Sequence, residues 1–395
     1  MADYLTILNS GPPAQLMGLG NLLREGLYRE AKRLNLTYFF ENIAEAELES
    51  HQACKGVIGM VWSERLRIRL AAMELPVVNT SNSHGPVEGF ANALSDDLEV
   101  GRMAAEHLWG CGYRRFLIIA FKGFDYAEQR QSGFKQYVTE RGGVLSTLYV
   151  EAETYSHYGN PVRYLATMWE ALGETLQGLA PETGIFGISD WIAWPVLHFL
   201  KNKLIDLHYT CAVIGVDNLG DDYYDPSRYS ELSSVLPGFR EAGRQAIGWI
   251  AEHDREGVSL ENKLHRCRPE GVARRMSTAG VACADARVSL VLRNMWILLR
   301  QQRDVVLSDL ARGAGMSKRV MELRFHEALG QSARDFLLQF RISFAKELLR
   351  QPYLAIAQVA ERCGYREMAS FTNAFRRATG QSPRAWRLAQ NSHDS

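Results

Sequence analysis

Short apolar runs alternate with amphipathic stretches along the first 270 residues of the chain. Apolar runs rich in β-branched and aromatic side chains predict buried strands, and stretches with an apolar period of about 3.6 residues predict helices. We expect strands at 4–8, 36–40, 56–62, 76–79, 115–120, 144–150, 184–188 and 211–216. We expect helices between them at about 15–33, 97–109, 127–140 and 190–202.

Strands that are apolar along their whole length and separated by helices are typical of parallel sheets covered on both faces. So many strands predict two α/β lobes rather than one sheet. In open sheets of this kind a ligand binds beyond the carboxyl ends of the strands. With two lobes, we expect those ends to face each other across a cleft.

Near its C-terminus the chain contains an internal repeat. The sequence GQSAR at 330–334 returns as GQSPR at 380–384, and before each copy the pattern predicts a helix, a glycine-containing turn and a second helix. This order is typical of the DNA-binding helix-turn-helix. A helix at about 287–300 precedes the repeat. A connecting helix at 334–349 would hold the two recognition helices about 34 Å apart, one turn of duplex DNA.

In the first copy, a supporting helix at 307–313 leads to a turn at Gly315, and Ser317 is a good cap for the recognition helix. The inward stripe of that helix is Met321, Phe325 and Leu329. The residues assigned to DNA binding are Ser317, Lys318, Arg319, Glu322 and Leu323. Arg319 suits a bidentate contact with guanine, and Glu322 either accepts from cytosine or pairs with Arg319.

In the second copy, the supporting helix lies at 356–363, the turn at Gly364, and the recognition helix begins at Glu367 with Phe371 and Phe375 inward. The residues assigned to DNA binding are Met368, Ala369, Thr372, Asn373, Arg376 and Arg377. Asn373 suits adenine, the two apolar side chains suit thymine methyl groups, and the two arginines suit phosphates.

The net formal charge is zero, but it is unevenly distributed. Residues 285–395 hold 18 basic and 10 acidic side chains, whereas the rest of the chain holds 27 and 35. A basic C-terminal part on an acidic body indicates a nucleic-acid reader joined to another domain. A merely solvated basic surface is the alternative, and the repeat argues against it.

Composition excludes several classes of protein. No apolar run approaches the length of a membrane span, and the first residues lack the pattern of a signal peptide. Six cysteines are scattered without a C-x-x-C pair, which favours reduced thiols and a cytoplasmic protein. We predict no metal site and no cofactor.

Residues 288–387 resemble the AraC family of transcription activators. The matching residues are Leu310-Ala311, Gly315, Ser317, Phe325, Leu329-Gly330, Arg341, Ala345, Leu348-Leu349, Val359-Ala360, Cys363-Gly364-Tyr365, Phe371, Phe375, Gly380, Pro383 and Arg387. The resemblance implies an all-α domain with two helix-turn-helix units that reads duplex DNA. Two positions depart from the family pattern: Glu367 stands where a serine or aspartate cap is usual, and Thr372-Asn373 replaces a Ser-Arg pair.

Residues 1–278 resemble the LacI/GalR effector domain, which is similar to periplasmic sugar-binding proteins. The matching motifs are Pro76–Asn79, Asp97 with Gly101, Gly112–Arg115, Arg130 with Gly133-Phe134, Ile188–Asp190, Val213–Asn218 and Ser233–Val235. The resemblance implies a two-lobed α/β domain of the periplasmic-binding-protein kind and ligand contacts at Arg130 and Asp217. The order of the two parts is similar to that of AraC-family regulators of the XylR type. We therefore expect an effector domain at 1–278, a linker at 279–286 and a DNA-binding domain at 287–390.

A neutral sugar needs fixed hydrogen-bonding groups for its hydroxyls and an aromatic ring for its C–H face. The candidate ligand-binding residues are Ser10, Gln15, Trp62, Phe124, Tyr126, Arg130, Asp190, Trp191, Asp217 and Asn218. Structural alternatives remain for five of them: Asp217 as a turn residue, Arg130 as a helix cap or salt-bridge partner, Trp62 and Trp191 as lobe packing, and Asp190 as a helix cap.

The leading hypothesis is a sugar-responsive transcription regulator, an activator of a carbohydrate operon with xylose suggested by the resemblance. Its expected partners are duplex DNA with direct-repeat half-sites, a monosaccharide and a second copy of the chain; contact with RNA polymerase is compatible with this assignment, and no membrane is involved. A DNA-repair alkyltransferase sharing the same reader is the enzymatic alternative, which needs an activated cysteine. Cys363 is better explained as a small packing residue, and the sequence holds no G-x-S-x-G, H-E-x-x-H or P-loop motif. An exported solute-binding protein would share only the effector fold.

Overall fold

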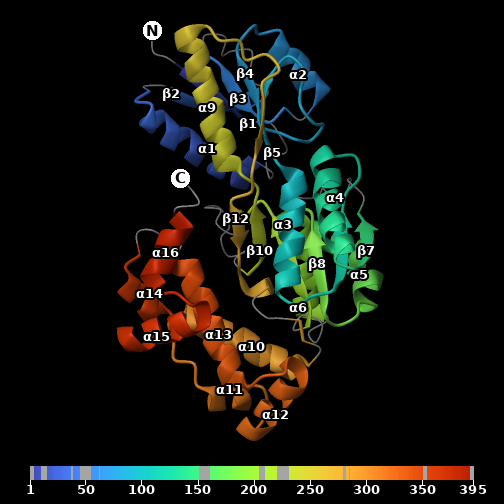
Figure 1. Ribbon diagram of the computed structural model, residues 1–395. Coiled ribbons are helices and arrows are strands. Elements are labelled where there is room, and N and C mark those ends of the chain that lie inside the picture. The colour runs from blue at the N-terminus through green and yellow to red at the C-terminus, as the bar shows by residue number, and fades with distance from the viewer. Residues whose placement is uncertain are drawn as a thin grey trace. The chain divides into compact units, whose positions relative to one another are not determined.

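The computed structural model describes residues 4–9, 16–36, 39–44, 55–61, 63–150, 161–203, 210–219, 231–278, 282–283, 285–349 and 354–391. The chain divides into two compact units, 1–278 and 279–395 (Figure 1). The first is an α/β unit with two lobes and the second is all-helical, which confirms the predicted fold class.

The first lobe is built on a six-stranded sheet with the order β11-β5-β4-β3-β1-β2. All of its described strand pairs are parallel. Its strands are β1 (Tyr4–Asn9), β2 (Phe39–Ala44), β3 (Val57–Gly59), β4 (Val77–Asn79), β5 (Ala91–Ser95) and β11 (Leu264–Cys267). Its helices are α1 (Leu16–Arg33), α2 (Glu64–Ala71) and α9 (Phe239–Glu256).

The second lobe repeats this plan with the strand order β12-β10-β9-β8-β6-β7, in which only β10 and β12 pair antiparallel among the described strands. Its strands are β6 (Arg115–Ala120), β7 (Val144–Tyr149), β8 (Thr183–Gly187), β9 (Ala212–Val216), β10 (Ser233–Leu236) and β12 (Gly271–Ala273). Its helices are α3 (Asp97–Gly110), α4 (Asp125–Glu140), α5 (Pro161–Gln177), α6 (Asp190–Lys203) and the 3-10 helix η4 (Met276–Thr278).

The chain passes between the lobes three times: from β5 to α3, from β10 to α9, and from β11 to β12. In each sheet the strand order reverses at the strand next to the edge, β1 in the first lobe and β6 in the second. Ligands of open α/β sheets bind at such reversals, beyond the carboxyl ends of the strands. The topology thus directs attention to the loops that follow these strands.

Both lobes pack one pair of helices closely through reciprocal glycines. A Cβ atom at Gly101 of α3 would lie 1.9 Å from the carbonyl oxygen of Arg130, and one at Gly133 of α4 would lie 1.9 Å from that of Leu98. In the first lobe, Gly26 of α1 and Gly243 of α9 make the same kind of approach to opposing carbonyls. Backbone contact of this kind excludes every side chain, and it fixes the position of α4 against α3.

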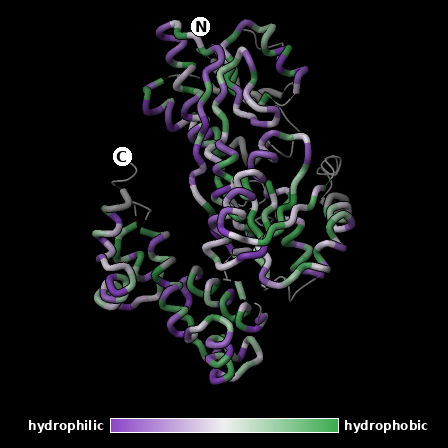
Figure 2. Tube along the Cα trace, turned by 45° about the vertical axis from the view of Figure 1, so that its right-hand side comes forward, coloured by the Kyte–Doolittle hydropathy of each residue, from purple (hydrophilic) through white to green (hydrophobic). Residues whose placement is uncertain are grey.

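The interior of each lobe is formed by the apolar strands, which Figure 2 shows as the green segments of the trace. In the first lobe, Leu27, Ile58 and Ile250 belong to a buried cluster beneath α1 and α9, and Leu66 and Val77 belong to a second cluster beneath α2. Both faces of this sheet are therefore covered, as parallel sheets require.

Most predicted strands are present, with two corrections. The second strand is β2 at Phe39–Ala44 rather than 36–40, because it pairs in parallel with β1 in a register that sets Tyr4 opposite Phe39. The third strand is only β3, Val57–Gly59, and residue 62 lies outside the described residues. Strands β5, β10, β11 and β12 and helices α2, α5 and α9 were not predicted.

The second unit consists of α10 (Ala286–Arg300), α11 (Leu307–Gly313), α12 (Lys318–Leu329), α13 (Ala333–Leu349), α14 (Ile356–Arg362), α15 (Met368–Thr379) and α16 (Pro383–Asn391). The predicted helices, including the connecting helix α13, are confirmed. Gly315 and Gly364, at the two turns, have φ of 66° and 76°, a left-handed conformation that glycine adopts without strain. Phe325 and Phe375 are fully buried, as the apolar stripes predict.

Candidate functional site

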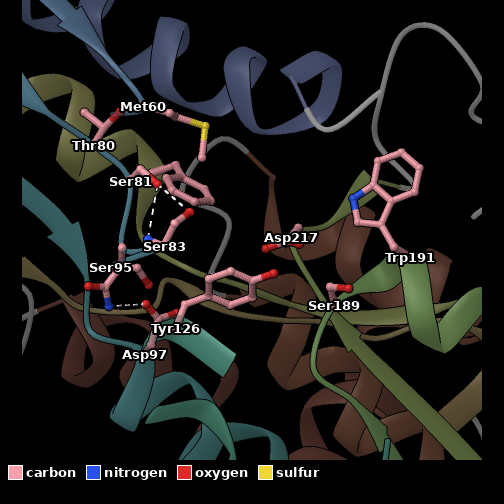
Figure 3. A pocket seen from close by; sticks show the side chains of 12 residues that line it. Met60, Thr80, Ser81, Ser83, Ser95, Asp97, Tyr126, Ser189, Trp191 and Asp217 are labelled. Carbon is pink, nitrogen blue, oxygen red and sulfur yellow. Dashed lines mark hydrogen bonds between the residues drawn. The ribbon is translucent and has the colours of Figure 1, made fainter. Parts of the chain in front are cut away.

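A cavity that is partly open to solvent lies at the carboxyl ends of strands from both lobes (Figure 3); its empty space, open solvent at the mouth included, is roughly 540 Å³. The lining residues are Met60, Thr80, Ser81, Asn82, Ser83, Ser95, Asp97, Tyr126, Ser189, Trp191, Asp217 and Phe239. The segments that follow β3, β4, β5, β6, β8, β9 and β10, each a loop or the first turn of the next helix, contribute at least one of them.

Four oxygen atoms of this lining are buried without a hydrogen-bond partner among the described residues. They are Oγ1 of Thr80, Oδ1 of Asn82, Oγ of Ser95 and Oγ of Ser189. Buried polar atoms in folded proteins almost always have a partner, and the part of the chain that the structure describes offers none to these four oxygens. A ligand with several hydroxyl groups, or ordered water in its place, would supply those partners.

The loop after β4 is positioned by Asn79, which is fully buried at the end of the strand. Its Oδ1 accepts from the amides of Val61 and Ser81 at 3.0 and 2.9 Å, and its Nδ2 donates to Asn92 Oδ1 at 3.0 Å. The polar chain of 80–83 is thus held at the cavity rather than in solvent.

The same loop joins the first lobe to helix α4 of the second. The residue before α4, Phe124, makes no side-chain cap. Instead the backbone amides of Asp125 and Tyr126 donate to the carbonyls of Ser83 and Asn82, at 2.9 and 3.0 Å. The Nδ2 of Asn82 also donates to Oδ2 of Asp97 at 2.8 Å, a hydrogen bond drawn in Figure 3.

A buried charged cluster forms the floor of the second lobe's side of the cavity. Arg130 donates from Nε to Asp97 Oδ1 at 2.7 Å and from Nη1 to the carbonyl of Ile188 at 2.7 Å, and it pairs with Asp217 Oδ1 at 3.4 Å. The ring of Tyr126 lies over its guanidinium, 4.9 Å from the centroid. Arg130 does not itself line the cavity, whereas both of its carboxylate partners do.

Burial raises the pKa of Asp217, and the nearby Arg130 opposes that rise. Asp217 has a φ of 101°, so it also forms the turn that ends β9. The two roles expected for Asp217, turn residue and ligand contact, are compatible, because the turn places its carboxylate at the cavity. Arg130 likewise fills the salt-bridge role that the sequence left open.

Two candidate residues lie beside the cavity without lining it. Asn218 accepts from Arg275 Nη2 at 2.6 Å through its Oδ1, and its amide donates to Ser234 Oγ at 2.9 Å. Asp190 is fully buried and accepts the Leu219 amide at 2.8 Å. The space for its carboxylate exists because residue 215 is glycine, whose Cβ would lie 2.0 Å from Asp190 Oδ1.

The pKa of Asp190 is raised well above its ordinary value, first by burial and then by the charge of Asp217. This residue lies in the first turn of helix α6, and its carboxylate accepts hydrogen bonds from the Leu219 amide, after β9, and from the side chain of Ser234 on β10. Its position thus favours bracing of that turn over direct ligand contact.

Two aromatic candidates line the cavity and one does not. Tyr126 and Trp191 are both part of the lining, and Figure 3 shows Tyr126 on the side of the first lobe's serines with Trp191 beyond Asp217. Phe124 packs instead against Tyr126, with tilted rings, and stacks on His84, with ring centroids 5.6 and 6.5 Å apart. The predicted residues Ser10, Gln15 and Trp62 lie outside the described residues.

Sequence reasoning missed most of the hydroxyl-bearing residues of the cavity. The missed lining residues are Met60, Thr80, Ser81, Asn82, Ser83, Ser95, Asp97, Ser189 and Phe239. A signal was present, because the polar run at 80–83 directly follows a predicted buried strand and Ser189 follows another. Polar residues in that position are expected at the ligand edge of the sheet.

In the first reader, Ser317 caps α12 by accepting the Val320 amide at 3.2 Å. Lys318, Arg319 and Leu323 are exposed, Leu323 to 59%. For Glu322 the structure shows a hydrogen bond that the sequence analysis did not include. Its Oε2 accepts the amide of Ala333 at 3.0 Å, which caps the start of α13, because α12 and α13 meet at this corner.

In the second reader, α15 begins at Met368 and the preceding Glu367 makes no side-chain cap. Met368, Ala369 and Asn373 are exposed, and Thr372 is half-buried. Arg376 and Arg377 lie exposed in the last turn. The exposed faces of the two readers therefore differ: cationic and aliphatic on α12, neutral at the start of α15.

Among the described residues, no helix is long and apolar enough to cross a membrane, and no cluster of side chains fits a metal ion. The five described cysteines are all free and buried. Cys363 is packed with Val359, Phe371 and Phe375 in the core of the second helix-turn-helix unit, as the sequence suggests.

Comparison with known protein families gives two matches. A periplasmic binding protein-like domain matches residues 105–292, and a helix-turn-helix domain matches residues 310–389. The xylose operon regulatory protein of Escherichia coli (strain K12) is 26% identical over 377 residues, which cover 92% of this chain and 91% of that relative. The protein of the same name from Haemophilus influenzae is 24% identical and covers 76% of this chain and 75% of the relative.

Solved structures repeat the pattern. One described as the xylose-binding transcription activator XylR superposes with a TM-score of 0.64 at 22% identity, covering 98% of both chains. A complex of the transcriptional regulator CelR with cellobiose superposes with a TM-score of 0.54 at 16% identity, covering 70% of this chain and 84% of that one. At these identities the likeness concerns the fold.

Proposed function

We propose that this chain, which belongs to the AraC-type transcription regulators with a periplasmic-binding-protein-like effector domain, binds a neutral monosaccharide in its cavity and adjusts promoter binding in response. The observation that carries the ligand assignment is the set of four unpaired buried oxygens in the cavity wall. Each is suited to one hydroxyl of a polyol.

The charge of the site favours a neutral ligand over a phosphorylated or acidic one. The guanidinium of Arg130 is already compensated by Asp97 and Asp217, which themselves face the cavity. An anion entering here would meet two carboxylates. Tyr126 and Trp191 supply aromatic faces for the C–H side of a sugar ring. Xylose is the first candidate, because two relatives whose matches cover 92% and 76% of this chain are named as xylose operon regulators.

The proposed contacts with DNA lie at the exposed starts of α12 and α15. Lys318, Arg319 and Leu323 would read one half-site, and Met368, Ala369, Thr372 and Asn373 a second, with Arg376 and Arg377 on phosphates. Glu322 is not retained as a base reader, because it caps α13. We further propose that two copies act together on direct repeats, in the cytoplasm, to activate a sugar-utilisation operon through contact with RNA polymerase.

Thermal unfolding of the full chain in the presence of D-xylose, other pentoses and hexoses tests the ligand arm. A sugar at millimolar concentration with micromolar affinity should stabilise the first unit by about 4 kcal/mol by mass action. Gel-shift assays with and without the stabilising sugar test the DNA arm. No shift with any sugar, together with equal binding of promoter and random DNA, would contradict the proposal.

The proposal assigns no chemical reaction to the chain. An alkyl-acceptor role would need an accessible, activated thiolate, and burial raises the pKa of Cys111 and, to about 12, that of Cys267. Cys363 is fully enclosed among aromatic rings. Mass spectrometry after incubation with alkylated DNA should find Cys111, Cys267 and Cys363 unmodified.

A further inference from the structure

Helix α3 has one end in the ligand cavity and the other at the residue where the first unit ends. At its start, Asp97 lines the cavity and bonds both Arg130 and Asn82. At its end, Nε2 of His107 lies 2.9 Å from Oγ1 of Thr278. The thiol of Cys111, the C-cap of the helix, lies 3.9 Å from the carbonyl oxygen of the same threonine.

Thr278 is the last residue of the first unit and is held from several sides. Besides His107, its hydroxyl lies 2.7 Å from Oγ of Ser233 on β10, and its carbonyl accepts from Nε of Arg274 at 3.3 Å. The preceding Ser277 donates from Oγ to the carbonyl of Val213 on β9 at 2.5 Å. Thr278 is only 1% exposed, so its place is set by the second lobe and not by solvent.

A displacement at one end of α3 should reach the other end largely undiminished. The 14-residue helix is about 21 Å long and holds no proline or kink-forming bulge. It packs against β9, β10 and β12, the strands that surround Thr278. The backbone contact of Gly101 with Arg130 also ties it to α4, so the two helices move as a block.

The described contacts that fix the chain in the second unit begin at residue 283. Cys283 is 1% exposed, and its carbonyl accepts from Ser289 Oγ at 3.3 Å. Asp285 caps α10, and its Oδ2 accepts from Nη1 of Arg324 on the first recognition helix at 2.6 Å. Four residues, 279–282, therefore separate an anchor on the effector unit from an anchor on the reader.

We infer that α3 carries the effector signal out of the cavity, with His107, Ser233 and Thr278 as positioning residues that convert a shift of Asp97 into a shift of the chain entering the reader. The inference rests on the proposed function, since it needs a ligand at Asp97 and DNA at the readers. Its physical content is a coupling free energy between the two sites that depends on the hydroxyl of Thr278.

The test compares full-length wild type with Thr278→Val, which keeps the shape of the side chain and removes its hydrogen bonds. Thr278→Ser serves as the rescue. Thr183→Val is the matched control, because Thr183 is equally buried in the same lobe but its hydroxyl bonds the carbonyl of Ala180, at 2.7 Å, and not a residue of α3, β10 or η4. D-xylose affinity is measured by calorimetry. DNA affinity is measured by fluorescence anisotropy with and without D-xylose, on a duplex selected from a random pool by the wild type.

We expect Thr278→Val to bind D-xylose within about twofold of wild type while the sugar-induced change in its DNA affinity falls by at least about fivefold. Thr278→Ser should restore the change and Thr183→Val should keep it. By reciprocity, the effect of DNA on sugar affinity must fall by the same factor.

An unaltered sugar response in Thr278→Val, or an equal loss in Thr183→Val, overturns the inference and leaves the proposed function standing. If no pentose or hexose changes the DNA affinity of the wild-type protein, the proposed function is overturned, and the inference with it. The two failures are thus separated by the wild-type measurement.

Discussion

Nε of Arg130 donates to Oδ1 of Asp97 across 2.7 Å, and this bond joins helix α4 to the first turn of α3 at the edge of the ligand cavity. Both side chains are almost completely buried, at 5% and 1% exposure. The pair is therefore at once a structural link between two helices and the boundary of the proposed sugar site.

Replacement of the buried cation should be severely destabilising. In Arg130→Met, Asp97 and Asp217 would remain buried beside each other without compensation, at a cost of about 3–5 kcal/mol. Urea unfolding monitored by circular dichroism measures the loss. Arg102→Met on α3 is the matched control, because Arg102 pairs with Glu99 and Glu106 at an exposed site and should cost less than about 1 kcal/mol. Similar costs for the two variants would refute the assigned role of the cluster.

The unpaired hydroxyl of Ser189 should affect ligand affinity and stability in opposite directions. Ser189→Ala removes a buried polar atom without a partner, so the ligand-free protein should become more stable, by up to about 1 kcal/mol. Sugar affinity should fall by about 5- to 100-fold, since one hydroxyl of the ligand loses its acceptor. Calorimetry with the stabilising sugar and thermal unfolding measure the two effects. Ser146→Ala, whose hydroxyl bonds Phe116 O outside the cavity, should leave affinity unchanged.

The close approach of α3 and α4 should tolerate no side chain at residue 101. Gly101→Ala would drive a Cβ into the carbonyl oxygen of Arg130, at 1.9 Å, so α4 must move or the lobe must unfold. We expect a loss of several kcal/mol and of sugar binding together, on the order of the larger overpacking costs. Gly110→Ala at the end of the same helix meets nothing within 4 Å and is the control. A folded Gly101→Ala protein that binds sugar normally would contradict the packing argument.

His107 should make the first unit less stable in mild acid. Burial lowers the pKa of His107 from 6.5 to about 3, so the folded protein keeps a neutral imidazole while the unfolded chain takes up a proton below about pH 6.5. Stability is thus complete above that pH and is lost as the pH falls from 6.5 toward 3. Between pH 7 and 5.5 the loss should be about 1 kcal/mol. His107→Gln keeps a hydrogen-bonding group for Thr278 and should remove this part of the pH dependence; an identical slope in both proteins would refute it.

Loss of an arginine should affect DNA binding differently in the two recognition helices. Arg319→Ala at the exposed start of α12 should cost about 1–3 kcal/mol on the selected duplex and relax preference at one base pair. Arg377→Ala in the last turn of α15 should weaken binding to all sequences alike and reduce its salt dependence. Anisotropy titrations on a panel of single base-pair changes at two salt concentrations distinguish them. Equal behaviour on every duplex would show that the assignment of base and phosphate contacts is wrong.

The helical reader could be predicted nearly to the residue because its local pattern is complete. Turn glycines, the Ser317 cap and the buried phenylalanines all act within a few residues of one another, so sequence spacing reveals them. The hydrogen bond from the Ala333 amide to Glu322 could not be predicted, because it depends on how α12 meets α13. Spacing on one helix says nothing about that corner.

The ligand cavity was harder to predict, since its residues come together only through the sheets. Strand β5 was missed because Ala91–Ser95 is small and polar, yet it is entirely buried. Asn92 is satisfied there by Asn79 and by the carbonyls of Val87 and Phe90, partners that no local pattern discloses. The sequence singles out Arg130 and Asp217 as candidate ligand contacts, but the structure adds Asp97 as the second ion-pair partner of Arg130, a residue that the sequence singles out only as part of a motif.

The short chain between Thr278 and Cys283 limits how far the DNA-binding unit can move from the effector unit. Five Cα-to-Cα steps span at most roughly 18 Å, so the Cα atom of Cys283 can lie no farther than that from the Cα atom of Thr278 in the same chain. Two protomers sharing one promoter could engage both half-sites together only where the spacing of the operator suits this reach. A promoter rebuilt with more distant half-sites would forfeit the avidity of paired binding, and a few glycines and serines inserted at 279–282 would return it.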